Sequence, residues 1–185
     1  LNLEMGLAPE IMHIAAELRP HHVCLVPEKR QELTTEGGLA LDADDQRMRD
    51  AIARLQDNGT AVSLFIDPEP DTVQAAASLG ARAVELHTGA WAEQWLEVQA
   101  LGGAAERSQV VAELRRLESA AAAARDSGLI CNAGHGITYR NVRELLHLPG
   151  LHELNIGHTI VARALLVGMR QAVADMRHLI TTGPG

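Results

Sequence analysis

The chain of 185 residues has few aromatic side chains: two Trp, one Tyr and one Phe, or 2 percent of the sequence. Since 46 percent of the residues are nevertheless hydrophobic, the core must be built from Ala, Leu, Val and Ile. Lysine is equally scarce, and Lys29 is the only one among 16 basic residues. Schiff-base catalysis by the protein itself would therefore depend on this single side chain.

Other absences narrow the class of protein. The formal net charge of −8 argues against a nucleic-acid partner held by bulk charge. No apolar stretch approaches the roughly 18 residues that a membrane-spanning helix requires, so no membrane partner is expected. The two cysteines, Cys24 and Cys131, lie in or at the end of apolar runs, and no signal peptide is recognisable. Such thiols indicate a reducing compartment, and we expect a cytoplasmic protein.

Short apolar runs alternate with longer helical patterns along the chain. The runs, which show no alternation of polar and apolar residues, predict six strands, at 1–5, 22–26, 61–66, 83–89, 128–136 and 152–158. The helical pattern at 91–126 is long enough for two helices, with a break at Gly102–Gly103, and the pattern at 159–180 predicts one last helix. Six strand–helix units in series favour a parallel sheet with helical crossovers.

Two α/β architectures fit this series: an open doubly wound sheet and a closed (β/α)8 TIM barrel. A barrel usually takes about 250 residues. Six units that begin inside a strand indicate a barrel of which this chain supplies about the last six strand–helix units, as a single partial domain over residues 1–185.

In either architecture, function collects at the carboxyl ends of the strands. Charged, amide and imidazole side chains follow the expected strands there, and they are Glu4, Asp67, Glu85, His87, Asn132, His135, Asn155 and His158. Burying such groups is unfavourable unless they are paired or used in chemistry. The polar loop at 27–39, which contains Gly37–Gly38, is expected to act as a lid.

The individual residues leave alternatives open. Glu4 and Glu85 lie between apolar neighbours, so each is either a carboxylate satisfied by an arginine or a general base with a raised pKa. His135, between two glycines, is either a turn residue or a proton donor or acceptor that faces a ligand. The Gly157–His158 pair either makes a turn or presents backbone N–H groups to a phosphate. A metal site at His87, His135 and His158 is a further alternative, although we expect no metal.

The stretches NLEM, CLVPEKRQELTTEGGL, VSLFID, VELHTG, NAGHGITYRNV and HELNIGHTIVARAL together resemble the pyridoxine 5'-phosphate synthase family. The resemblance implies a TIM barrel assembled as a homo-octamer, without metal or organic cofactor. It implies a transferase of vitamin B6 biosynthesis that condenses 3-amino-2-oxopropyl phosphate with 1-deoxy-D-xylulose 5-phosphate, releasing phosphate and water. The family's Asn-x-Asp-His and His-x-Arg stretches are not in this sequence, so the chain resembles roughly the last three quarters of the enzyme.

Carried over by position, the resemblance implies roles for seven residues. Glu4 resembles the proton acceptor, His135 the proton donor, and Glu85 the carboxylate that stabilises the transition state. Contacts to the substrates are implied for Thr34, Gly136, Gly157 and His158. The alternatives are another phosphosugar-binding barrel, such as an isomerase or epimerase, and a catalytically incomplete fragment that only binds phosphate.

Overall fold

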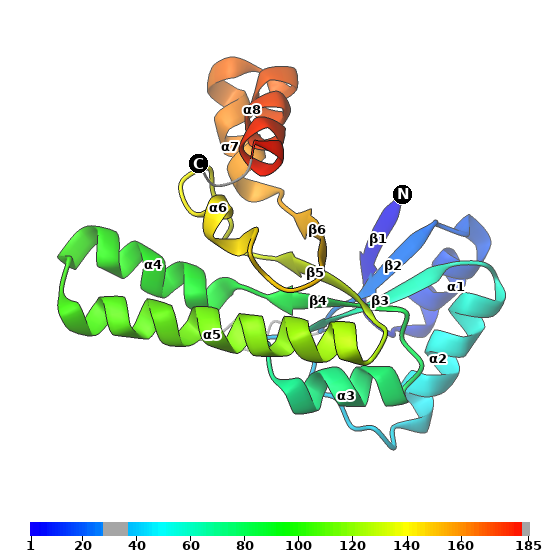
Figure 1. The fold of residues 1–185 in the computed structure, drawn as a ribbon. Helices are drawn as coiled ribbons and strands as arrows, with labels where there is room; N and C mark the ends of the chain where they lie inside the picture. The colour runs from blue at the N-terminus through cyan, green and yellow to red at the C-terminus, as the bar shows by residue number, and fades with distance from the viewer. Residues whose placement is uncertain (28–36, 183–185) are drawn as a thin grey trace.

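The computed structural model describes residues 1–27 and 37–182, and within them six strands form one sheet (Figure 1). The strands are β1 (Asn2–Met5), β2 (His22–Leu25), β3 (Ala61–Ile66), β4 (Ala83–His87), β5 (Ile130–Gly134) and β6 (Leu151–Asn155). They pair in the order of the sequence, and every pairing is parallel. A doubly wound sheet reverses its strand order at a switch point, whereas a barrel does not. The prediction of a partial TIM barrel is therefore confirmed.

Helices follow the strands on the connections between them. They are α1 (Pro9–Leu18), α2 (Gln46–Asp57), α3 (Pro70–Ser78), α4 (Gly89–Leu101), α5 (Ala104–Asp126), α6 (Val142–Leu145), α7 (His158–Val167) and α8 (Met169–Thr181). The expected break after Leu101 is confirmed, and Gly102 ends α4 with a φ of 69°. The prediction of one last helix was wrong, because Gly168 has a φ of 81° and separates α7 from α8. A backbone angle of this sign favours glycine and interrupts a helix.

The sheet has two unlike faces, because successive side chains of a strand point to opposite sides. One face carries apolar residues such as Val23, Leu64 and Val84, which join the helices in the hydrophobic core. The other carries most of the polar groups: in register order, Cys24 pairs with Ser63, and Glu85 pairs with Asn132. Both faces are nevertheless buried in the central strands, since three of four residues of β2 and all five of β4 are buried, as the sequence-based expectation of no alternation implies.

Leu64 in β3 is fully buried on the apolar face. We expect Leu64→Ala to lower the free energy of unfolding by about 2–5 kcal/mol, because it removes buried methyl groups and leaves a cavity. Urea unfolding followed by circular dichroism measures this loss. The matched control is Leu165→Ala in α7, where the leucine is 85 percent exposed and a change within about 0.5 kcal/mol is expected. Equal losses in the two variants would contradict the assigned core.

Helices α7 and α8 pack against each other as a pair that projects from the rest of the chain (Figure 1). The first residue of α7 follows β6 closely, so the start of this helix lies at the carboxyl end of the sheet. No helix among residues 1–27 and 37–182 is long and apolar enough to cross a membrane.

Candidate active site

Glu85 is a buried carboxylate on the polar face of β4, with a relative exposure of 4 percent. Its Oε2 accepts hydrogen bonds from Asn155 Nδ2 at 2.5 Å and from Cys24 Sγ at 3.5 Å. Ser63 Oγ in turn donates to Cys24 Sγ at 3.7 Å. Neighbouring strands lie about 4.8 Å apart, so donors from β2 and β6 can reach one oxygen on β4 only because the sheet is curved. The polar face is thus the inner, concave face.

The surroundings of Glu85 determine its charge. Burial raises the pKa of this carboxyl, and the nearby negative charge of Glu4 acts in the same direction. The hydrogen bonds from Asn155 and Cys24 favour the carboxylate and oppose the effect of burial. The raised pKa brings the carboxyl nearer to neutrality, where it can donate a proton or a hydrogen bond as well as accept one.

Glu4 lies on the same face of the sheet, in register with Cys24 on the neighbouring strand. Unlike Glu85, it is exposed. Among the described residues, none forms an ion pair with the carboxylate of Glu4, so the alternative in which an arginine satisfies Glu4 gains no support. An exposed carboxylate beside the Glu85 network is accessible to a ligand.

Gly134 ends β5 directly beside Glu85. A Cβ atom on this residue would overlap with Oε1 of Glu85 and lie 3.2 Å from the backbone oxygen of Asn155. Glycine is therefore required here because a carboxylate occupies the space of its side chain. Gly134 thus lies against Glu85 in space and immediately precedes His135 in the chain.

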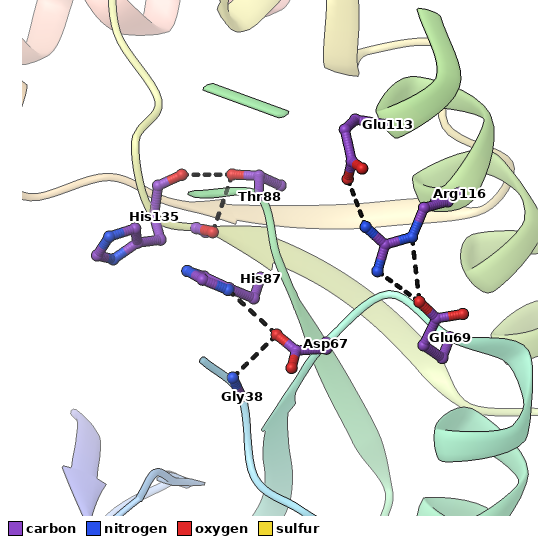
Figure 2. A network of polar contacts seen from close by, with 9 residues as sticks. Gly38, Asp67, Glu69, His87, Thr88, Glu113, Arg116 and His135 are labelled. Carbon is purple, nitrogen blue, oxygen red and sulfur yellow. Dashed lines mark hydrogen bonds and ion pairs between the residues drawn. The ribbon is translucent and has the colours of Figure 1, made fainter. Parts of the chain in front are cut away.

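His135 has a φ of 81°, and among the described residues it shares a positive φ only with Arg19 and with glycines. A non-glycine residue in this conformation is uncommon and is often found at functional sites. The single O–H of Thr88 is shared between the backbone oxygens of Gly134, at 2.9 Å from Oγ1, and of His135 (Figure 2). The imidazole itself is exposed. Thr88 thus holds the backbone turn that presents this ring at the rim.

His87 and Asp67 form a second polar pair next to His135. The rings of His87 and His135 lie 4.9 Å apart, edge to face. His87 Nδ1 lies 3.2 Å from Asp67 Oδ1, which also accepts a hydrogen bond from the Gly38 N–H at 3.0 Å (Figure 2). The hydrogen bond with His87 lowers the pKa of Asp67, and the Gly38 N–H adds to the effect. Asp67 is therefore a carboxylate at neutral pH.

The start of α7 is open. Gly157 is its N-cap residue, no side chain caps the helix, and a Cβ on Gly157 would meet nothing within 4 Å. The backbone N–H groups at such a helix start are a favourable place for an anion. Asn155, two residues earlier, contacts Glu85, so this helix start lies near the same end of the sheet.

The structure brings together most of the residues that the sequence predicted. Glu4, Glu85 and His135 lie on or at the end of the concave face, Gly136 follows His135, and Gly157 and His158 begin α7. Thr34 and most of the expected lid loop lie outside the described residues. In the described chain no group of three or more His, Cys, Asp or Glu side chains is arranged to hold a metal ion, so the three-histidine alternative has no geometric support there.

Sequence reasoning missed the contacts that surround these residues. Cys24 was interpreted only as a buried thiol, although it lies one strand away from Glu4 and donates to Glu85. Asp67 and His87 were recognised as strand-end residues but not as a pair. The available signal was the alternation of side chains along each strand. Once the strand register is known, it places Glu4, Cys24, Ser63 and Glu85 on the same face of the sheet.

Solved structures support the class of fold. The chain is similar to HMG-CoA lyase from Brucella melitensis, with a TM-score of 0.58 and 16 percent identity over 98 percent of this chain and 65 percent of that one. It is also similar to the HpcH/HpaI aldolase from Desulfitobacterium hafniense, with a TM-score of 0.53 and 13 percent identity over 98 percent of this chain and 72 percent of that one. These identities show the fold alone: the chain is an α/β half-barrel of the TIM-barrel type, with polar groups gathered at its carboxyl rim.

Sequence comparison gives the family. The profile described as "Pyridoxal phosphate biosynthesis protein PdxJ" matches residues 1–182, and the chain belongs to this family. A curated relative from Akkermansia muciniphila, named pyridoxine 5'-phosphate synthase, is 52 percent identical over 181 residues. The alignment covers 97 percent of this chain and 69 percent of that protein.

Proposed function

We propose that the protein acts as a pyridoxine 5'-phosphate synthase. The reaction joins 3-amino-2-oxopropyl phosphate to 1-deoxy-D-xylulose 5-phosphate and releases phosphate and water. Membership of the PdxJ family and the name of the similar Akkermansia protein support this proposal. The single observation that carries it is that a buried carboxyl, Glu85, lies against Gly134, the residue that immediately precedes the rim imidazole of His135.

The chemistry requires proton transfer more than covalent catalysis by the protein. An amine and a ketone condense to an imine with loss of water, and the amine belongs to the aminoketone substrate. A lysine nucleophile is then unnecessary, in keeping with a chain that has only one lysine. Ring closure still needs groups that remove and supply protons, which is work for carboxylates and imidazoles.

Three residues are proposed for these proton transfers. Glu4, exposed on the concave face, accepts a proton from the substrate. His135 donates one at the rim, where its ring is accessible. Glu85, whose pKa is raised by burial, stabilises the charge that develops in the transition state.

The phosphate of the aminoketone is proposed to bind at Gly136, Gly157 and His158. The uncapped start of α7 and the open space at Gly157 support this placement. Thr34 is proposed to contact the deoxyxylulose phosphate. The partners are thus phosphorylated small molecules, and we further propose that the protein works in the cytoplasm as a homo-oligomer, an octamer by resemblance.

An activity assay of the protein tests the proposal directly. Incubation with both substrates should yield pyridoxine 5'-phosphate and inorganic phosphate, detected by mass spectrometry and a phosphate assay. Glu4→Gln should lower kcat by about 10²–10⁴-fold because it removes the proton acceptor. The control Glu10→Gln changes an exposed carboxylate in α1 and should be neutral. Isomerisation of the sugar phosphate without the aminoketone would instead favour an isomerase or epimerase.

A further inference from the structure

Two consecutive residues at the end of β4 contact the turn that carries His135. Thr88 holds the backbone of this turn through its N–H, which donates to Gly134, and through its hydroxyl, which is shared between Gly134 and His135. His87 contacts its ring, with the two ring centroids 4.9 Å apart and the planes inclined by 62°. Phe65 packs against His87 from the neighbouring strand, with centroids 5.1 Å apart. The backbone and the ring of His135 are therefore supported separately.

His87 is itself held in place by burial and by a hydrogen bond with Asp67. It is 9 percent exposed, and its Nδ1 faces Asp67 Oδ1 at 3.2 Å. Asp67 is anchored in turn by the Gly38 N–H. Asp67 is ionised and accepts only, so the shared proton resides on His87 Nδ1. The other ring nitrogen, Nε2, is buried and has no hydrogen-bond partner within the described chain.

We propose that Asp67 and His87 form a positioning pair for His135, in which Asp67 holds His87 as the Nδ1–H tautomer and His87 orients the His135 ring. The effect on turnover rests on the proposed role of His135 as proton donor, whereas the orientation itself does not. A carboxylate that accepts a hydrogen bond from an imidazole N–H fixes the tautomer and the orientation of that ring, here His87.

The need for such a pair follows from the turn. His135 lies between two glycines, and its own φ is 81°. The flanking glycines carry no side chains that could pack against the ring, and β4 supplies one contact to it. His87 makes this contact, and its own position depends on Asp67.

Gly89 shows how closely the two rings approach. A Cβ on Gly89 would lie 2.5 Å from His87 Nε2 and 3.1 Å from His135 Cδ2. The space beside both rings is thus kept free by the absence of a side chain at the first residue of α4. The buried Nε2 and the edge of the His135 ring both border this space.

Two substitutions separate the parts of the pair. Asp67→Ala removes the acceptor but leaves the His87 ring. His87→Asn keeps a donor near Asp67 but removes the ring. The matched control is Glu69→Ala, because Glu69 lies two residues from Asp67, has the same side-chain exposure of 49 percent, and pairs with Arg116 instead of a histidine. Thermal unfolding verifies that each variant is folded.

The first readout is the imidazole spectrum of protein labelled with ¹⁵N-histidine, which distinguishes the two neutral tautomers without any substrate. We expect the Nδ1–H form for His87 in the unmodified protein and a shift toward Nε2–H in Asp67→Ala. The ring signals of His135 should move in Asp67→Ala and in His87→Asn, and should stay in place in Glu69→Ala.

The second readout is kinetic. Outer partners that orient a functional imidazole contribute about 10–100-fold to activity, and we expect Asp67→Ala and His87→Asn to lower kcat by this amount while KM changes less than threefold. An Nε2–H tautomer in the unmodified protein, or His135 signals that stay in place in both folded variants, would overturn the proposal. Absence of synthase activity in the unmodified protein would reject the proposed function but leave the spectroscopic test intact.

Discussion

His135→Asn is expected to lower kcat by about 10²–10⁴-fold, the usual contribution of a positioned proton donor. Asparagine cannot donate a proton at neutral pH, but among non-glycine residues it tolerates a positive φ well. It should therefore keep the turn, whose φ is 81°, and the hydrogen bond that the backbone oxygen accepts from Thr88. The substitution also removes the edge contact with His87, so the free energy of unfolding should fall by about 0.5–1.5 kcal/mol, which leaves the protein folded.

Steady-state kinetics with both substrates and urea unfolding check these two expectations. His152→Asn is the matched control, because His152 is an exposed histidine in β6 whose side chain is 61 percent accessible. It should leave kcat within a factor of two. If His135→Asn turned over as fast as this control, His135 would not be the proton donor.

Gly134→Ala is the second change with a large expected effect. The new Cβ would overlap with Oε1 of Glu85, which is held on its other side by Asn155 and Cys24. Glu85 must therefore move, and a displacement of about 1 Å at a reacting site can reduce the rate by about 10²-fold. Overpacking should also lower the free energy of unfolding by about 1–3 kcal/mol.

The comparison is with Gly157→Ala, since a Cβ at Gly157 meets nothing within 4 Å and its φ of −109° suits alanine. This variant should be as stable as the unmodified protein, and any kinetic change should appear in KM for the aminoketone phosphate. Urea unfolding and kinetics of both glycine variants distinguish the two effects. A stable, fully active Gly134→Ala protein would show that the position of Glu85 does not matter.

The sequence predicts the parallel sheet well because its signals are local. Apolar runs mark the strands, and the break in the long helical stretch falls at a glycine with positive φ, Gly102. The same signal was present at Gly168, but an apolar helical pattern continues on both sides of that residue. The pattern outweighed the glycine, and the two last helices were predicted as one.

The candidate site residues were predicted from their place after strands, but their contacts could not be predicted. Cys24 and Asn155 both reach Glu85 although they are separated from it by 61 and 70 residues. Contacts between residues so far apart in the sequence depend on strand register and on the curvature of the sheet, which no short sequence pattern specifies. The positive φ of His135 likewise results from the turn as a whole, because histidine has no intrinsic preference strong enough to predict it.

The two unlike faces of the sheet have a consequence for how this protein can change over generations. Val84 and Glu85 are neighbours in the chain, yet Val84 packs in the hydrophobic core and Glu85 lies in the polar network that we propose as the active site. Mutations of strand residues that point to the polar face can alter activity while the fold remains stable. Mutations of the residues that face the core should change only stability. A mutational scan of the strands should therefore show effects on stability and effects on activity at alternating positions.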